Sequence, residues 1–226
     1  MRYRSQLVVD LARFGHNVDR LREYCRRQDI IFMVKADGYG HGSIPLVQYA
    51  YQELGIKEFG LASLGEALRL REHLPDLPLE LYVFSDVQIE LQQSKESYLY
   101  RRIYPVISNL DDLSFFLRDK ELRHFPLILK FNTGMNRLGL GMHEREKVID
   151  LIKQSGRKSI RHLMSHFACA SESMQDNELN RQQIENFRLL KKDFSGSGIH
   201  IEQSSLANSG ALEQGVGLDE THVRPG

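Results

Sequence analysis

The stretch IIFMVKADGYGHG, residues 30–42, runs a continuous apolar segment directly into a lysine and a glycine-rich loop. A continuous apolar run is typical of a strand buried on both faces, as in a parallel sheet. We therefore predict a strand at residues 30–34 that brings the Lys35 amine to the start of a loop. The three glycines of GYGHG would let the backbone of that loop approach a ligand closely.

Further short apolar runs follow along the chain, with segments of helical spacing such as LGEALRLREHL and HEREKVIDLIKQ between them. The runs are FGLAS (59–63), LELYVF (79–84), YPVIS (104–108), LILKF (127–131), IRHLMSHF (160–167) and IHIEQ (199–203). Strands alternating with helices predict βαβ units and a parallel sheet.

The number of these units favours an α/β fold of the (β/α)8 TIM type. The eighth strand would begin at THVRPG, residues 221–226, where the sequence stops, so we expect it to be truncated and to leave two open sheet edges. A doubly wound open sheet is the alternative. An earlier run, LVVDL (7–11), precedes the first helix and need not belong to the barrel.

Composition limits the functional classes. The chain has 226 residues, and Lys+Arg and Asp+Glu both number 30, so nothing favours nucleic acid or a membrane as partner. Two isolated cysteines, Cys25 and Cys169, do not make a disulfide framework. We see neither a signal peptide nor a membrane span, and we expect one barrel domain, residues 1–226, in the cytoplasm.

In parallel α/β folds, chemistry gathers at the carboxyl ends of the strands. The polar residues after the apolar runs would therefore share one rim: Lys35, Tyr39, Lys130, Met135, Arg137, His166, Asn208, Ser209, Arg224 and Gly226. Each has an ordinary interpretation, such as a solvated terminal charge for Lys35 or a helix N-cap for Ser209. The histidines lack metal-ligand spacing, so we expect no metal site.

Taken together, one amine, a phosphate-sized pocket, a histidine facing a ring and two arginines suit pyridoxal 5′-phosphate (PLP). The sequence also resembles bacterial alanine racemases, which are barrel-type PLP enzymes. The resemblance covers nearly the whole chain, including VDLARFGHNVDRLR, MVKADGYGHG, FGLASLGEALRLRE, LKFNTGMNRLGL, MSHFACASE, SLANSGAL and VRPG. VKADGYGHG and NTGMNRLG are its most specific motifs.

The resemblance implies that Lys35 forms the internal aldimine with PLP and acts as the base on the D-face of alanine. It further implies that Tyr39, Ser209 and the backbone amide of Gly226 bind the phosphate, and that Asn208 also binds the cofactor. These roles come from the family's pattern, matched position by position.

Five more roles follow from the same resemblance. His166 would lie beside the cofactor ring, Arg137 would bond its phenolic oxygen, and Arg224 would face its pyridine nitrogen. Met135 would approach the substrate carboxylate through its backbone, together with Arg137. Lys130 matches a lysine that is carbamylated in some members, where the new charge holds Arg137.

Two departures from the family are visible. Ser205 stands where many members have a histidine that supports the pyridine-facing arginine. The family also continues beyond RPG into a β-rich C-terminal domain, which carries the tyrosine base for the L-face and acts across a homodimer.

We therefore expect an N-terminal fragment of an enzyme that interconverts L- and D-alanine for peptidoglycan, with weak activity or none by itself. A PLP-binding barrel without catalysis, a racemase of broader specificity and a D-amino-acid aldolase remain as alternatives.

Overall fold

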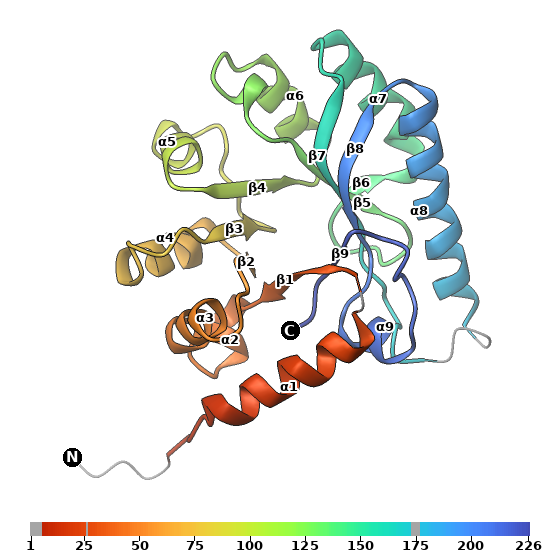
Figure 1. Ribbon diagram of the computed structural model, residues 1–226. Coiled ribbons are helices and arrows are strands. Elements are labelled where there is room, and N and C mark those ends of the chain that lie inside the picture. Colours follow the sequence, from red (N-terminus) through yellow and green to blue (C-terminus); the bar gives the residue numbers. More distant parts are fainter. Residues whose placement is uncertain (1–5, 26, 173–176) are drawn as a thin grey trace.

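The computed structural model describes residues 6–25, 27–172 and 177–226. Within these residues, eight parallel strands form a ring and helices surround it (Figure 1). The barrel strands are β1 (Asp29–Met33), β2 (Glu58–Leu61), β3 (Glu80–Val83), β4 (Ile103–Ile107), β5 (Ile128–Asn132), β7 (Ser159–Met164), β8 (His200–Ser205) and β9 (His222–Val223). Each apolar run predicted as a strand overlaps one of them, and the run at residues 7–11 lies outside the barrel strands, as expected.

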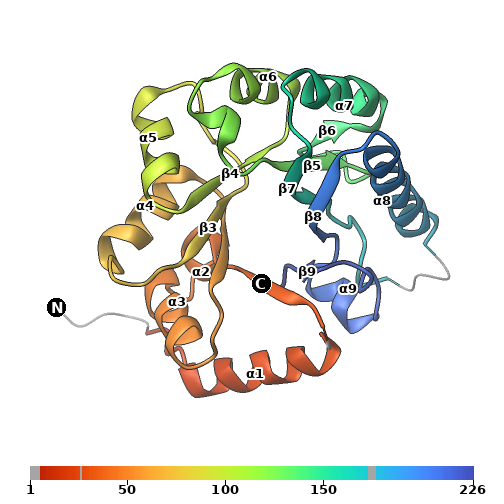
Figure 2. The ribbon, with the colours of Figure 1, turned by 45° about the horizontal axis from the view of Figure 1, so that its top comes forward.

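The helices follow the strands in the predicted order. They are α1 (Leu11–Tyr24), α2 (Lys35–Tyr39), α3 (Ser43–Gln52), α4 (Leu64–His73), α5 (Gln92–Tyr100), α6 (Leu110–Arg118), α7 (Arg145–Gln154), α8 (Glu178–Gly196) and α9 (Ser209–Glu213), with 3-10 turns η1 (Leu122–His124) and η2 (Met142–Glu144). Viewed along the barrel, the helices encircle the strands and the C-terminal end lies near the middle of the ring (Figure 2).

The barrel is closed, so the expectation of two open edges was wrong. The short strand β9 pairs with β1 through Asp29 and His222, and with β8 through Ser205 and His222. Hydrogen bonds continue the closure beyond β9, because Met33 N donates to Pro225 O at 2.8 Å. On the other side of the ring, β4 pairs with β5. These pairings confirm the barrel and exclude the doubly wound open sheet.

One short strand was not predicted. β6 (Leu140–Gly141) pairs with the end of β5 outside the ring, with Phe131 opposite Leu140. It folds the chain that follows β5 back against that strand. The loop between the two strands carries Arg137, so this pairing holds that loop at the barrel mouth.

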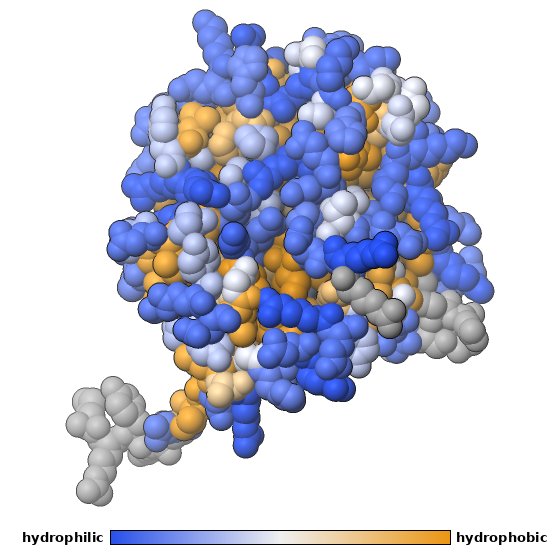
Figure 3. Space-filling view, in the orientation of Figure 1, coloured by the Kyte–Doolittle hydropathy of each residue, from blue (hydrophilic) through white to orange (hydrophobic). Residues whose placement is uncertain are grey.

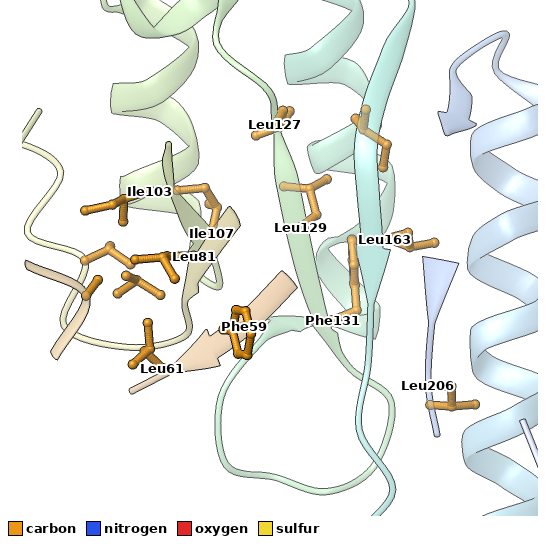
Figure 4. Close-up of a cluster of buried hydrophobic side chains, with 14 of the residues drawn as sticks. Phe59, Leu61, Leu81, Ile103, Ile107, Leu127, Leu129, Phe131, Leu163 and Leu206 are labelled. Carbon is orange, nitrogen blue, oxygen red and sulfur yellow. The ribbon is translucent and has the colours of Figure 1, made fainter. Parts of the chain in front are cut away.

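The core has two parts, because successive side chains of a strand point to opposite faces. Ile128 packs inside the barrel, in a cluster with Ile31, Tyr82, Tyr104, Val106 and Met164. Its neighbour Leu129 packs outside the barrel in a larger apolar cluster, which includes Phe59, Leu81, Phe131 and Leu163 (Figure 4). Continuous apolar runs are therefore required at these strands, as the sequence predicts.

Charged residues fill the amino end of the barrel. Arg161 pairs with Glu80 and lies 4.4 Å from the ring centre of Tyr104. The Tyr82 hydroxyl donates to Glu58 at 3.0 Å. These groups satisfy one another's charges and hydrogen bonds in a mostly buried layer. Chemistry is therefore expected at the other end of the barrel, where the strands end.

Hydrophilic residues cover most of the face seen in Figure 3, and hydrophobic atoms show mainly in the recesses between them. Within the described residues, we find no helix that is both long enough and apolar enough to span a membrane.

Candidate active site

A cavity of about 430 Å³ lies at the carboxyl end of the barrel. Its walls contain four cationic side chains, those of Lys35, Lys130, Arg137 and Arg224. The other lining residues are Met33, Tyr39, Ala62, Phe84, Ser85, Leu138, His166, Asn208, Ser209, Gly210 and Gly226. Among the described residues, no carboxylate lines this cavity, so it is suited to an anionic ligand.

The backbone after β1 turns with the left-handed conformation. Ala36, Asp37, Gly38 and Tyr39 have φ values of 51°, 52°, 64° and 53°. A left-handed turn costs each residue other than glycine about 1–2 kcal/mol. Lys35 lies directly before this strained turn, and its side chain is half-buried at the cavity wall.

The Lys35 amine is predisposed to lose its proton. Burial lowers the pKa of Lys35 below its ordinary value, the positive charge of Arg137 lowers it further, and Glu66 opposes both effects. A lysine with a lowered pKa has a larger neutral fraction at pH 7, and the neutral amine is the form that attacks a carbonyl. The site therefore supports amine chemistry at Lys35.

Lys130 is a second perturbed amine, on β5. Its side chain is only 5% exposed. Burial lowers the pKa of Lys130 to about 8, with further lowering by the charges of Arg224, Arg137 and Lys35. A substantial neutral fraction of this lysine is therefore present near physiological pH.

Arg224 is held inside the barrel by three neighbours. It donates to the Ser205 hydroxyl and to the Ser165 carbonyl, and its Nη2 lies 3.5 Å from His166 Nδ1. Ser205 Oγ also contacts His162 Nε2 at 2.8 Å. Burial lowers the pKa of Arg224 to about 10, which leaves the guanidinium charged at neutral pH.

His166 is a neutral imidazole. Burial lowers the pKa of His166 to about 3, and the nearby charges of Arg224 and Lys130 act in the same direction. A neutral ring beside the guanidinium of Arg224 can accept a hydrogen bond from it through Nδ1.

Small hydrogen-bond donors also line the cavity. Gly226 N donates to Ser209 Oγ at 3.1 Å. A Cβ atom at Gly226 would lie 2.8 Å from Met33 Cβ and 2.9 Å from the Tyr39 ring, so a side chain does not fit there. Asn208 caps α9, since its side chain accepts from Ala211 N at 3.1 Å. A hydroxyl and a backbone amide are thus presented side by side.

The fold gathers nearly all the residues that the sequence placed on one rim. Lys35, Tyr39, Lys130, Arg137, His166, Asn208, Ser209, Arg224 and Gly226 all line the cavity. Of the described residues predicted for the site, Met135 alone does not line it. The cause is local: Met135 lies in the loop between β5 and β6, where Arg137 rather than Met135 reaches the wall.

A family model described as "Alanine racemase, N-terminal domain" matches residues 9–226. The chain belongs to this family. An alanine racemase of Nitrosomonas eutropha is 32% identical over 222 residues, which cover 97% of this chain and 57% of that protein. The chain thus spans a little over half the length of such relatives.

Solved structures of alanine racemases share the fold. The enzyme from Streptomyces coelicolor A3(2) superposes with a TM-score of 0.81 at 26% identity, covering 96% of this chain and 57% of that one. An alanine racemase from Bartonella henselae, described with covalently bound pyridoxal phosphate, has a TM-score of 0.79 at 25% identity over 96% of this chain and 60% of that one.

Sequence reasoning missed two residues near the cavity of this barrel. Glu66 accepts hydrogen bonds beside Lys35, although SLGE resembles an ordinary helix start. His162 supports Ser205 from β7, and a histidine inside an apolar strand was the available signal. Ser205 itself was singled out, and the structure places it against Arg224.

Within the described residues, no group of three or more His, Cys, Asp or Glu side chains is arranged to hold a metal ion.

Proposed function

We propose that this chain is the PLP-binding barrel of an enzyme that interconverts L- and D-alanine. The observation that carries the proposal is the cavity itself. It combines the Lys35 amine, whose pKa is lowered, with three further cations and no lining carboxylate among the described residues. PLP needs an amine for its aldehyde, hydrogen-bond donors for its phosphate and a positive partner for its phenolic oxygen.

The donor set fits this cofactor. The Ser209 hydroxyl, the Gly226 amide and the Tyr39 hydroxyl would bind the phosphate, with Asn208 beside them. Arg137 would bond the phenolic oxygen, Arg224 would face the pyridine nitrogen, and His166 would lie beside the ring. The lack of room for a side chain at Gly226 supports a close approach of the ligand to its backbone.

When bound, PLP withdraws electrons from the substrate Cα, so that its proton can leave. Lys35 would take and return that proton on the D-face, because its lowered pKa increases the neutral fraction of the amine. Arg224 remains charged and gives up no proton, so it would bond the ring nitrogen without protonating it. Arg137 is also a candidate for binding the substrate carboxylate.

Lys130 is proposed as a carbamylation site. Its neutral amine would form a bond to the carbon of CO2 and release a proton, which places a negative charge among three cations. Support comes from its pKa of about 8 and from the charges of Arg224, Arg137 and Lys35 around it. A 13C carbamate signal that requires Lys130 would test this assignment.

The activity is proposed for the enzyme to which the barrel belongs, because the chain spans 57% of the matched relative. Racemisation by two bases needs groups on opposite faces of Cα. We expect little racemase activity from the 226-residue chain alone, and we expect the whole enzyme to be a cytoplasmic homodimer that provides D-alanine for peptidoglycan. Rapid racemisation of alanine by the chain alone would contradict the first expectation.

The test is cofactor capture. PLP is added to the 226-residue chain, the mixture is reduced with borohydride, and the modified lysine is mapped by mass spectrometry. We expect an adduct on Lys35 that is lost in Lys35→Ala and retained in Lys57→Ala. An adduct elsewhere, or none, would contradict the proposal. If this chain captures PLP but the full-length enzyme that contains it does not racemise alanine, the result would favour a PLP-binding protein without catalytic activity.

A further inference from the structure

The carboxylate of Glu66 joins two strand ends. Oε1 accepts from Ala36 N at 2.8 Å, and Oε2 accepts from Ala62 N at 2.8 Å. Ala36 follows β1 and Ala62 follows β2, so one side chain from the first turn of α4 ties both loops at the cavity rim. Ala62 itself lines the cavity.

This arrangement differs from an ordinary capping box. Ser63 is the N-cap of α4, and its hydroxyl accepts from Glu66 N at 3.3 Å. In a capping box the glutamate side chain would return to the N-cap amide. Here the carboxylate instead bonds the residue before the N-cap and a residue 30 positions earlier in the chain. Helix capping alone does not require the second contact.

The second contact falls on the strained turn. Ala36 is the first left-handed residue after Lys35, with φ of 51°. The turn is closed by Gly38 N donating to Val34 O at 2.8 Å and by Gly40 N donating to Ala36 O at 3.0 Å. Two charge-assisted bonds from one carboxylate are suited to hold a non-glycine residue in this conformation.

We propose that Glu66 is a positioning residue, which holds the left-handed turn so that the Lys35 amine faces the cavity. The expected effect of Glu66 on PLP capture rests on the proposed function. Its expected effect on the conformation of the turn does not depend on that function. Glu66 also lies close enough to Lys35 for its negative charge to raise the pKa of the Lys35 amine.

The first test uses Glu66→Gln in the 226-residue chain, with Glu72→Gln as a matched control on the exposed side of the same helix. A glutamine has one acceptor oxygen, so it cannot satisfy both amides. Amide hydrogen exchange is measured by NMR. We expect exchange at Ala36 or Ala62, and at Gly38 and Gly40, to rise about tenfold or more in Glu66→Gln. Glu72→Gln should match wild type.

A rescue variant separates the turn from general stability. Glycine adopts left-handed conformations without the steric cost. In Glu66→Gln/Ala36→Gly, we therefore expect exchange at Gly38 and Gly40 to return toward wild type. Unchanged exchange in Glu66→Gln, equal acceleration of amides throughout the chain, or no rescue by Ala36→Gly would each overturn the proposal.

The second test uses PLP capture at Lys35. We expect slower capture in Glu66→Gln, partial recovery in the double variant, and wild-type capture in Glu72→Gln. If the wild-type chain captures no PLP, the proposed function fails, while the exchange measurements still decide the role of Glu66. If Glu66→Gln loosens the turn but captures PLP at the wild-type rate, the positioning role fails and the proposed function stands.

Discussion

Arg224 donates a hydrogen bond to the hydroxyl of Ser205 inside the barrel. The same hydroxyl lies 2.8 Å from His162 Nε2, so it can accept from the arginine and donate to the histidine. Burial keeps the pKa of His162 well below its ordinary value, so the ring is neutral, and Nε2 accepts in the tautomer that carries its proton on Nδ1. Ser205 and His162 together therefore support Arg224.

Ser205→Ala should therefore destabilise the fold. The change leaves buried polar atoms of Arg224 and His162 without this partner, which costs about 1–3 kcal/mol of unfolding free energy. Urea unfolding would measure the loss. Ser195→Ala, on the exposed side of α8, is the control and should change stability little. Equal stability of the two variants would show that the Ser205 hydroxyl is dispensable.

Lys130→Met should stabilise the protein most at neutral and lower pH. The folded-state pKa of Lys130, about 8, lies below the ordinary value of 10.5. The unfolded state thus binds more protons between these values, and stability rises with pH there. Burying the charged amine costs at most about 3 kcal/mol below pH 8, and this cost disappears as the pH approaches 10.5.

Thermal unfolding of Lys130→Met and wild type over pH 6–10.5, in CO2-free buffer, would test this dependence. The stability gain of the variant should be constant below about pH 8 and should shrink above it. Lys153→Met, at an exposed position on α7, is the control and should show no such trend. A gain that grows with pH would contradict the lowered pKa.

Gly38→Ala should be more harmful than Gly40→Ala. Both glycines are left-handed, with φ of 64° and 84°. A Cβ atom at Gly38 would lie 2.8 Å from Leu46 Cδ1, whereas nothing lies within 4 Å of one at Gly40. The two variants share the conformational cost, and Gly38→Ala adds a steric clash of about 1–3 kcal/mol.

Urea unfolding of these two variants isolates the clash, since the conformational cost cancels in their difference. Equal destabilisation would mean that Leu46 moves aside without loss. We would then expect Leu46→Ala to have no effect on Gly38→Ala.

Arg137→Gln should shift the pH profile of Lys35. The charge of Arg137 lowers the pKa of Lys35, so its removal should raise that pKa and leave less neutral amine at pH 7. The pH midpoint of PLP capture should move upward, as measured by borohydride trapping across pH. Arg118→Gln, exposed on α6, is the control. Weaker capture with an unmoved midpoint would mean that Arg137 acts only by contact with the ligand.

Much of the fold and of the candidate site can be predicted from the sequence alone. Continuous apolar runs separated by helical segments specify parallel strands, because both faces of each strand are buried in a barrel. Residues that follow such strands must meet at one rim, and this rule alone brings Lys35, His166 and Arg224 together. The residue types and their order in the motifs VKADGYGHG and NTGMNRLG pointed to the family.

Other features depend on pairs of residues far apart in the chain. Local patterns did not show that two residues of β9 suffice to close the barrel, because closure depends on backbone pairing with both β1 and β8. Local patterns also placed Met135 on the rim, but it does not line the cavity. The bond from Glu66 to Ala36 arises only when segments 30 residues apart pack together. Hydrophobic periodicity specifies which face of an element is buried, but hydrogen-bond partners are chosen by the three-dimensional positions of donors and acceptors.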